Sequence, residues 1–86
     1  MSTETEVRNV VRSYILKEFL PGVPESELTD TTPLISGGIL DSLATVRLVA
    51  MLEDRYKVEI EAHEASITHF NAVADIAALV QSKSRT

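Results

Sequence analysis

Residues 37–43 of the chain read GGILDSL, and the amphipathic run ATVRLVAMLEDRY follows directly over residues 44–56. Asp41 is a favoured N-cap, because its carboxylate accepts hydrogen bonds from the free backbone N–H groups of a first helical turn. The apolar residues after it recur at helical spacing, which predicts a helix that begins immediately after Asp41. The sequence thus places the hydroxyl of Ser42 at the exposed start of a helix, where a phosphate group could be attached and held.

Apolar residues at three-and-four spacing predict two further helices, one on either side of this segment. The first begins with Thr3 and Glu6, which form a capping-box pattern, and it ends at the Pro21-Gly22 pair. The last begins between residues 68 and 71. The three apolar faces are expected to comprise Val7, Val10, Val11, Tyr14, Ile15 and Phe19, then Leu43, Val46, Leu48, Val49, Leu52 and Tyr56, then Phe70, Val73, Ile76, Ala77 and Val80.

The segments between these helices differ in character. Residues 21–40 lack sustained periodicity but contain scattered apolar residues, so we expect a long loop pinned across the helices, with a helical turn near residues 25–28. Residues 57–60 alternate and predict a short extended connection, and residues 61–66 could form one or two helical turns. Residues 83–86 are expected to be a frayed, flexible tail. These elements predict an all-α fold with three main helices and one short helix.

The composition limits the possible classes of function. The 86 residues suffice for a single domain spanning residues 1–86, and the absence of cysteine removes disulfides, thiolate metal sites and a thiol nucleophile. A net charge of −5 disfavours nucleic acid as a binding partner and favours a partner with a basic surface. The need for solubility would explain the same charge without any partner. No apolar run could span a membrane, and the acidic residues 1–6 do not resemble a targeting peptide. We therefore expect a cytoplasmic monomer.

The sequence resembles the acyl carrier protein superfamily, which includes peptidyl and D-alanyl carrier proteins. The resemblance rests on residues 38–49 (GILDSLATVRLV), continues through residues 52–60 (LEDRYKVEI) and ends with residues 67–76 (ITHFNAVADI). It covers nearly the whole chain, with the first helix and the pinned loop in the expected order. The resemblance implies a stand-alone carrier domain with a four-helix bundle and a long loop between helices one and two.

The resemblance also implies a covalent cofactor. Ser42 would receive 4′-phosphopantetheine from coenzyme A through a separate phosphopantetheinyl transferase that uses magnesium, and the terminal thiol of this arm would hold a cargo as a thioester. In the family, the aspartate matching Asp41 helps to position the metal and the transferase, besides capping the helix. The chain itself is not expected to be an enzyme, because it has no Gly-x-Ser-x-Gly elbow and no histidine adjacent to Ser42.

The second helix is the docking surface of the family for partner enzymes. The implied partners are the transferase, an adenylating enzyme that loads an acyl or aminoacyl group, and a downstream synthase or transferase. Leu43 could alternatively be half-buried core. The positions expected to be exposed for docking are Leu43, Ala44, Arg47, Ala50, Met51 and Asp54.

The sequence departs from carriers of fatty-acid synthesis, which usually have acidic residues where this chain has Ala44 and Arg47. An arginine would be repelled by a basic fatty-acid enzyme, and such contacts set specificity. Residues 40–46 look more like carriers loaded by adenylating enzymes, which favours a dedicated biosynthetic pathway. The cargo stays open among fatty acyl, aminoacyl and polyketide-like groups. Four apolar residues could line an acyl pocket or fill the core, namely Val46, Val49, Ile60 and Val73.

Other functional interpretations have less support. An unmodified helical interaction module, in which Ser42 only begins a helix, is the main alternative. His63 and His69 lack paired-ligand spacing, and the acidic residues Glu25, Glu27 and Asp30 lack the spaced oxygen ligands of a calcium loop. We expect no metal site in the chain itself.

Overall fold

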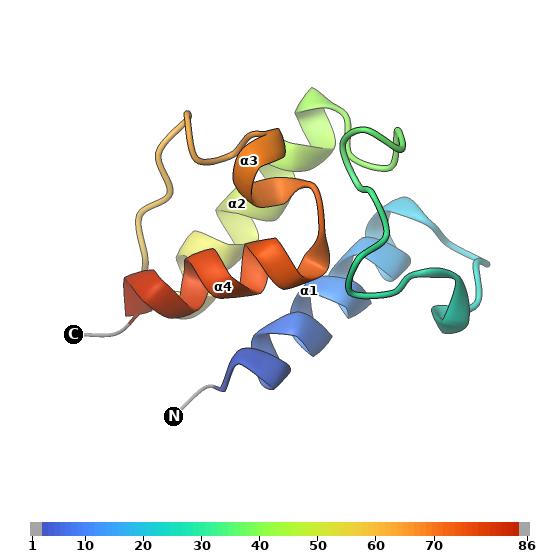
Figure 1. Cartoon of the computed structure of the whole chain (residues 1–86), viewed down its shortest axis with the longest axis horizontal. Helices are drawn as coiled ribbons and strands as arrows, with labels where there is room; N and C mark the ends of the chain where they lie inside the picture. Colours follow the sequence, from blue (N-terminus) through green and yellow to red (C-terminus); the bar gives the residue numbers. More distant parts are fainter. Residues whose placement is uncertain (1–2, 85–86) are drawn as a thin grey trace.

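A computed structural model describes residues 3–84 of the chain. Within these residues it contains four α-helices, no strand and one 3₁₀ turn, and none of the helices is long and apolar enough to cross a membrane. The all-α architecture and its long loop between the first two helices are as predicted (Figure 1). In chain order the elements are α1 (Glu4–Phe19), η1 (Glu25–Glu27), α2 (Ser42–Tyr56), α3 (Ile67–Phe70) and α4 (Val73–Ser84).

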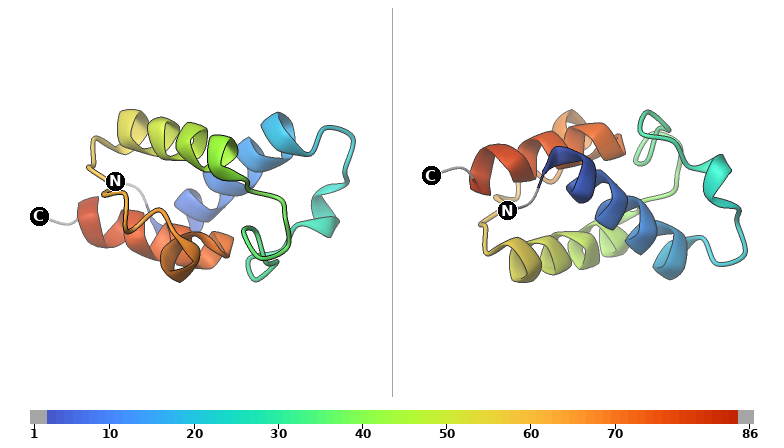
Figure 2. Two further views of the ribbon diagram at one scale, coloured as in Figure 1. Left: turned by 90° about the horizontal axis from the view of Figure 1, so that it is seen from above. Right: turned by 90° about the horizontal axis from the view of Figure 1, so that it is seen from below.

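The core forms where α1, α2 and α4 meet, and α3 closes it against α4 (Figure 2). Each long helix contributes residues spaced three or four apart, which places them on one face. Burial of each large apolar side chain contributes about 1.5–3 kcal/mol, so these residues hold the bundle together. The fully buried members are Val7, Val11, Ile15, Leu48, Leu52, Phe70, Val73, Ile76, Ala77 and Val80.

Local signals in the sequence set the ends of α1 and α2. The hydroxyl oxygen of Thr3 accepts a 3.1 Å hydrogen bond from the N–H of Glu6, as the capping-box pattern predicted. The backbone leaves α1 at Leu20, directly before Pro21. At the C-terminal end of α2, Lys57 adopts a left-handed conformation with φ 55°, which ends the helix and begins the extended connection.

The long loop is pinned as predicted, by Leu28, Leu34 and Leu40, which are almost fully buried. Asp30 adds polar anchors. Its carboxylate oxygens lie 3.0 Å from Arg8 and 2.8 Å from Arg12 on α1, and its carbonyl accepts from the N–H of Ala74 on α4. The loop is therefore fixed to two helices before it reaches the start of α2.

The helices of the C-terminal third differ from the sequence prediction, which began the last helix between residues 68 and 71, whereas α4 begins at Val73. Residues 61–66 form turns, and the short helix is α3 at Ile67–Phe70, separated from α4 by Asn71 and Ala72. Lys83 and Ser84, where the flexible tail was expected to begin, form the end of α4, and Lys83 pairs with Glu64. Arg85 and Thr86, the rest of that predicted tail, lie outside the described residues.

The two ends of the described chain lie close to each other. The first turn of α1 and the last turn of α4 occupy one end of the molecule, whereas the start of α2 points to the other (Figures 1 and 2). The start of α2 is thus remote from the start of α1 and from the end of α4.

Candidate functional site

Ser42 is the first residue of α2, and its side chain is exposed. Asp41 caps the helix, since its Oδ1 accepts a 2.8 Å hydrogen bond from the N–H of Ala44. The carbonyl of Asp41 accepts from both the N–H (2.9 Å) and the hydroxyl (2.8 Å) of Thr45. The predicted N-cap is confirmed, and it fixes the orientation of the turn that carries Ser42.

The first turn of α2 leaves backbone donors beside the Ser42 hydroxyl. Within residues 3–84, the N–H groups of Ser42 and Leu43 donate to no protein acceptor. These donors and the positive end of the helix dipole favour a negatively charged group at this position. A phosphodiester on Ser42 Oγ would lie where the backbone stabilises its charge.

A tight turn brings the chain to Ser42, and it requires both glycines of the quoted motif. Gly38 has φ +82°, a conformation that side chains rarely adopt. A Cβ on Gly37 would overlap the carbonyl oxygen of Pro33. The carbonyl of Leu34 accepts from the N–H groups of Ile39 and Leu40, at 2.8 and 2.9 Å, and so closes the turn.

Asn71, which is distant in the sequence, also holds this turn. Its Oδ1 accepts 2.9 Å hydrogen bonds from the N–H groups of Ile35 and Ser36, and its carbonyl accepts from the N–H of Leu34. Asn71 lies between α3 and α4, so it fixes the approach to Ser42 relative to the C-terminal helices. The sequence analysis missed this positioning role, because the partners are about 35 residues away and no local pattern marks them.

A groove of about 660 Å³ begins at Asp41 and Ser42 and runs between α2, residues 60–66 and α3. We call it the Ser42 groove. Val46 and Ile67 are 64% and 55% exposed beside it, whereas Val73 is fully buried in the core and does not line it. Its main apolar lining residues are Leu40, Val46, Val49, Ile60, Ala65 and Ile67.

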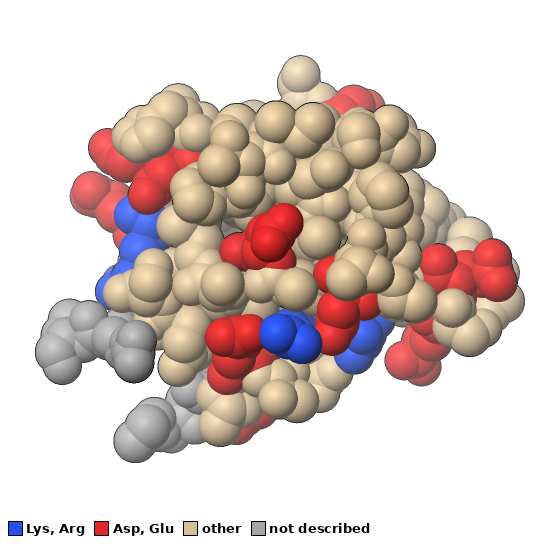
Figure 3. Space-filling model, viewed as in Figure 1, with Lys and Arg blue, Asp and Glu red and all other residues tan. Residues whose placement is uncertain are grey.

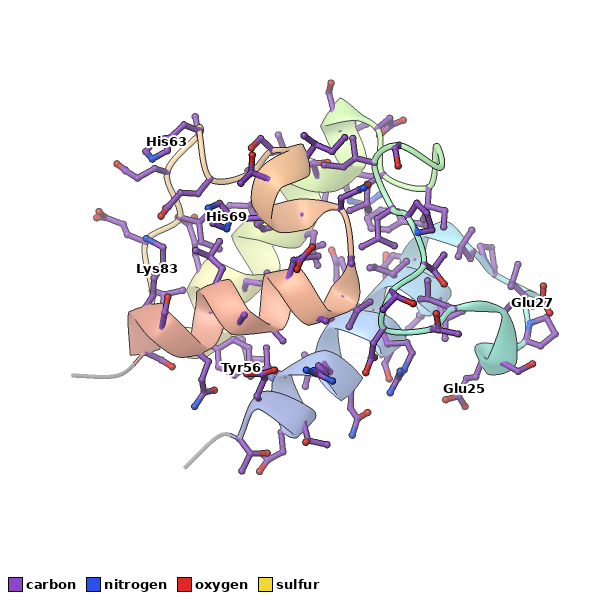
Figure 4. The ribbon with its side chains drawn as sticks, viewed as in Figure 1. Glu25, Glu27, Tyr56, His63, His69 and Lys83 are labelled. Carbon is purple, nitrogen blue, oxygen red and sulfur yellow. The ribbon has the colours of Figure 1, made fainter. Side chains whose placement is uncertain are left out.

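The wall of the Ser42 groove formed by residues 60–66 is tied at both ends. Glu53 Oε2 accepts from the N–H of Ile60 at 2.9 Å. Glu64 Oε1 accepts from the N–H of Glu61 and lies 2.8 Å from Lys83 Nζ, which reaches from α4 toward the segment that carries His63 (Figure 4). The hydrogen bond from Lys83, assisted by that from Glu61, lowers the pKa of Glu64 below its ordinary value.

The predicted docking residues of α2 differ in exposure, and four of the six are exposed. Leu43 is 68% exposed, and Arg47, Ala50 and Asp54 are also exposed on a continuous strip of the helix. Met51 is half-buried. The prediction that Ala44 is exposed is wrong: it is 7% exposed and faces the core.

The reason for this correction is the rotation of α2. Its buried face contains Ala44, Thr45, Leu48 and Leu52. This leaves Val46, which was expected to line an acyl pocket or to fill the core, 64% exposed beside the Ser42 groove. Apolar residues cover more of the circumference of α2 than the bundle can bury. The sequence was therefore compatible with two rotations of the helix, one that buries Val46 and one that buries Ala44. The number of large apolar residues in α2 could have indicated from the sequence that one apolar stripe is exposed to solvent.

Arg47 makes contacts within the chain as well as with solvent. Its guanidinium lies 3.1 Å from Glu18 Oε1 and 5.6 Å from the centre of the Phe19 ring. These contacts hold the start of α2 against the end of α1. The positive charge of Arg47 is therefore partly compensated at the surface.

The histidines and acidic residues considered as metal ligands are dispersed over the described part of the chain. Within residues 3–84, no three His, Asp or Glu side chains lie together as a metal site would require. Glu25 and Glu27 are exposed on η1, on the far side of the molecule from His63 (Figure 4). Figure 3 shows few charged side chains over α3, whereas acidic and basic groups lie next to each other toward α1.

An exposed serine at a capped helix start, beside an apolar groove in a small helical bundle, defines a carrier domain by its architecture. The family model described as phosphopantetheine attachment site matches residues 15–80. The chain therefore belongs to this family, whose domains carry a covalently attached 4′-phosphopantetheine and are non-catalytic carriers.

Two solved structures resemble the chain, and one of them is a carrier protein. A chain in a structure described as "Crystal structure of FAD-dependent dehydrogenase" is 40% identical, with a TM-score of 0.73, and the match covers 81% of this chain and 97% of that one. A peptidyl carrier protein, described as "Structure of KstB-PCP(apo)", is 25% identical with a TM-score of 0.68, and the match covers 93% and 88% of the two chains. No curated protein sequence matches significantly.

The residues around Ser42 fit such an arm. The hydroxyl of Ser42 is exposed, two backbone donors beside it suit a phosphate, and the Ser42 groove offers apolar surface next to that hydroxyl. The arm supplies a thiol, which the chain lacks.

Proposed function

We propose that Ser42 carries the 4′-phosphopantetheine arm and that the protein presents an aminoacyl thioester to the enzymes of a dedicated pathway. The exposed hydroxyl of Ser42, at the capped start of α2 and inside the family-matched region, carries this proposal. Asp41 would contact the transferase and its magnesium while it caps α2. The modification uses coenzyme A, so we place the protein in the cytoplasm. We also propose that it is a monomer.

Partner enzymes would dock on the exposed strip of α2 and on the neighbouring end of α3. Leu43, Arg47, Ala50 and Asp54 belong to this surface, and Val46 and Ile67 add exposed apolar area beside Ser42. Ala44 supports the surface from below, because it is buried. Large exposed apolar side chains beside an attachment point are typical of a contact surface that is covered during function.

An aminoacyl cargo is favoured over a long fatty acyl chain. The centre of the bundle is filled by fully buried side chains, among them Leu48, Phe70 and Ile76, so a cargo would rest in the surface groove. The likeness to a peptidyl carrier protein supports the same class. An adenylating enzyme would supply the aminoacyl group, since adenylation activates the carboxylate for attack by the arm thiol.

The likeness to a chain in a dehydrogenase structure points to one downstream enzyme class. We propose that a flavin-dependent dehydrogenase oxidises the thioester-bound cargo, removing two hydrogens from it and reducing FAD to FADH2. The 40% identity over most of both chains supports this partner. The carrier supplies position only, because the redox chemistry belongs to the flavin.

Intact-mass measurement tests the attachment site. The protein incubated with coenzyme A, magnesium and a broad-specificity phosphopantetheinyl transferase should gain one phosphopantetheinyl group. Ser42→Ala should gain none while keeping its circular-dichroism spectrum. Ser66→Ala removes another hydroxyl that lines the same groove, so it should still be modified. A modified Ser42→Ala protein would refute the assignment and favour another attachment residue.

A second experiment, on the holo protein, tests the cargo and the partner enzyme together. Carriers loaded with aminoacyl or long-chain acyl groups would be offered to a flavin-dependent dehydrogenase, and bleaching of the flavin absorbance would be followed. We expect bleaching with the aminoacyl form and little with the acyl form. Equal elongation of the holo protein by generic fatty-acid enzymes would contradict the dedicated pathway.

A further inference from the structure

A second groove, of about 400 Å³, lies between α1 and α2. Its apolar floor includes Val10 and Tyr14 from α1 and Met51 from α2, and the basic residues Lys17 and Arg55 also line it. We call it the α1–α2 groove. Neither the attachment of the arm nor the Ser42 groove uses any of these five residues.

The two cations of this groove differ from the other basic residues that the structure describes. Lys17 and Arg55 have no ion-pair partner within residues 3–84, and the Arg55 guanidinium lies only near the ring of its neighbour Tyr56, at 6.0 Å. The nearby acids Glu18 and Asp54 already pair with other cations. The residues that do have a carboxylate oxygen between 2.6 and 3.9 Å away are Arg8, Arg12, Arg47, Lys57 and Lys83.

This arrangement is unusual in a chain with a net charge of −5. Most of its described cations are neutralised locally, whereas the two that are not flank the same apolar floor. A basic segment would meet two like charges there, and an uncharged segment would leave both cations without a partner. A segment with carboxylates on either side of an apolar side chain complements both features of the groove.

The α1–α2 groove also lies away from the Ser42 groove. With 3.6 residues per turn, Met51 and Arg55 fall about 140° and 180° around α2 from Val46. A partner in the α1–α2 groove would therefore leave Ser42 and its exposed apolar neighbours open to another enzyme.

We propose that the α1–α2 groove binds an acidic amphipathic segment of a partner protein. One apolar side chain of that segment lies on Tyr14 and Met51, and its carboxylates pair with Lys17 and Arg55. Such a contact holds the carrier by its back face while the arm on Ser42 remains available. Binding does not depend on modification, so apo and holo protein bind the segment equally well.

The test uses a synthetic helical peptide built from leucine and glutamate, labelled for fluorescence anisotropy, and the full-length holo protein. We expect saturable binding that weakens as salt is added, because exposed charges are screened. Lys17→Gln and Arg55→Gln should each weaken it about two- to fivefold, the range for an exposed ion pair. Glu25→Gln changes one exposed charge on η1, outside the groove, and should leave affinity unchanged. Amide chemical shifts should move at α1 and Met51 and not at Val46 or Ile67.

Several outcomes would overturn the proposal. Absence of binding, or equal binding of a lysine-for-glutamate version of the peptide, would contradict an acidic occupant. Shifts confined to the Ser42 groove would place the contact elsewhere. Concentration-dependent dimerisation that Lys17→Gln and Arg55→Gln abolish would identify a second copy of the chain as the occupant. The Ser42→Ala protein should bind like the wild type, so a failure here is distinguishable from a failure of the attachment assignment.

Discussion

Lys83 Nζ lies 2.8 Å from Glu64 Oε1, and this contact joins the end of α4 to the wall of the Ser42 groove. Both side chains are mostly shielded, with 23% and 18% of their surface exposed. Glu64 also accepts from the N–H of Glu61, so one carboxylate orders the segment and attaches it to the bundle. The shape of the groove beside Ser42 therefore depends on a residue in the last turn of the last helix.

This ion pair predicts a pH dependence. The pKa of Glu64 is lowered in the folded protein, first by Lys83, so its contribution to stability is complete above its unfolded pKa and is lost as the pH falls through the folded pKa. Thermal unfolding between neutral and acid pH should show a smaller acid-induced loss for Glu64→Gln than for the wild type. Glu59→Gln, at an exposed position with no ion pair among the described residues, is the matched control. Parallel pH profiles of all three proteins would contradict this role of Glu64.

The two glycines before Ser42 should respond differently to alanine. Gly38→Ala meets open space but forces a side chain into φ +82°, at a cost of about 1–2 kcal/mol. Gly37→Ala places a methyl group against the Pro33 carbonyl oxygen and should cost about 3 kcal/mol, as backbone overpacking does. Urea denaturation measures both changes.

Gly22→Ala provides the control for this pair, because Gly22 has φ +87° and open space but lies far from Ser42 in the chain. It should cost as much as Gly38→Ala and leave the rate of phosphopantetheinylation unchanged. An equal loss of rate in both variants would show that the turn at Gly38 has no special role.

Asn71→Ala should destabilise the protein by about 1–2 kcal/mol, because the N–H groups of Ile35 and Ser36 lose a common acceptor. Asn71→Asp keeps an acceptor oxygen at the same position and should retain most of the stability. Hydrogen exchange should quicken at Ile35 and Ser36 in Asn71→Ala only. Unchanged exchange there would mean that Asn71 does not hold the turn.

Asp41 combines two roles that substitutions can separate. Asp41→Ala removes the N-cap and should cost about 1 kcal/mol, whereas Asp41→Ser keeps a capping oxygen and should restore most of that loss. If Asp41 also contacts the transferase and its magnesium, both variants should be modified slowly. Normal modification of Asp41→Ser would reduce the role of Asp41 to capping.

Val46→Asp should change the free energy of unfolding by no more than about 0.5 kcal/mol, because the side chain is 64% exposed. It should slow loading by the cognate adenylating enzyme, since a charge would enter the proposed contact surface. Ala78→Asp, at an exposed position of α4, introduces the same charge away from the groove. Equal loading rates for the two variants would argue against docking at Val46.

The sequence predicted those features that neighbouring residues determine. Thr3 and Asp41 mark the starts of α1 and α2 because an N-cap side chain and the backbone N–H group that donates to it lie three residues apart. The apolar residues of the long loop predicted its pinning for a similar reason, since a solvated linker would lack them.

Features that depend on distant residues could not be predicted. The rotation of α2, which buries Ala44 and exposes Val46, is decided by packing against α1 and α4. The contacts of Asn71 with Ile35, of Lys83 with Glu64 and of Arg47 with Glu18 join residues 19 to 36 positions apart. No sequence pattern of one helix or turn contains both partners of such a pair.

The positions of the chain ends have a practical consequence. Because the start of α1 and the end of α4 lie together and away from the start of α2, tethering the protein through either helix end would leave the exposed side chain of Ser42 accessible. A fluorescent protein, a sensor surface or a neighbouring enzyme domain joined by a short linker would sit behind the carrier. The fold can therefore be fused to other proteins, because a fusion at either helix end would not cover Ser42.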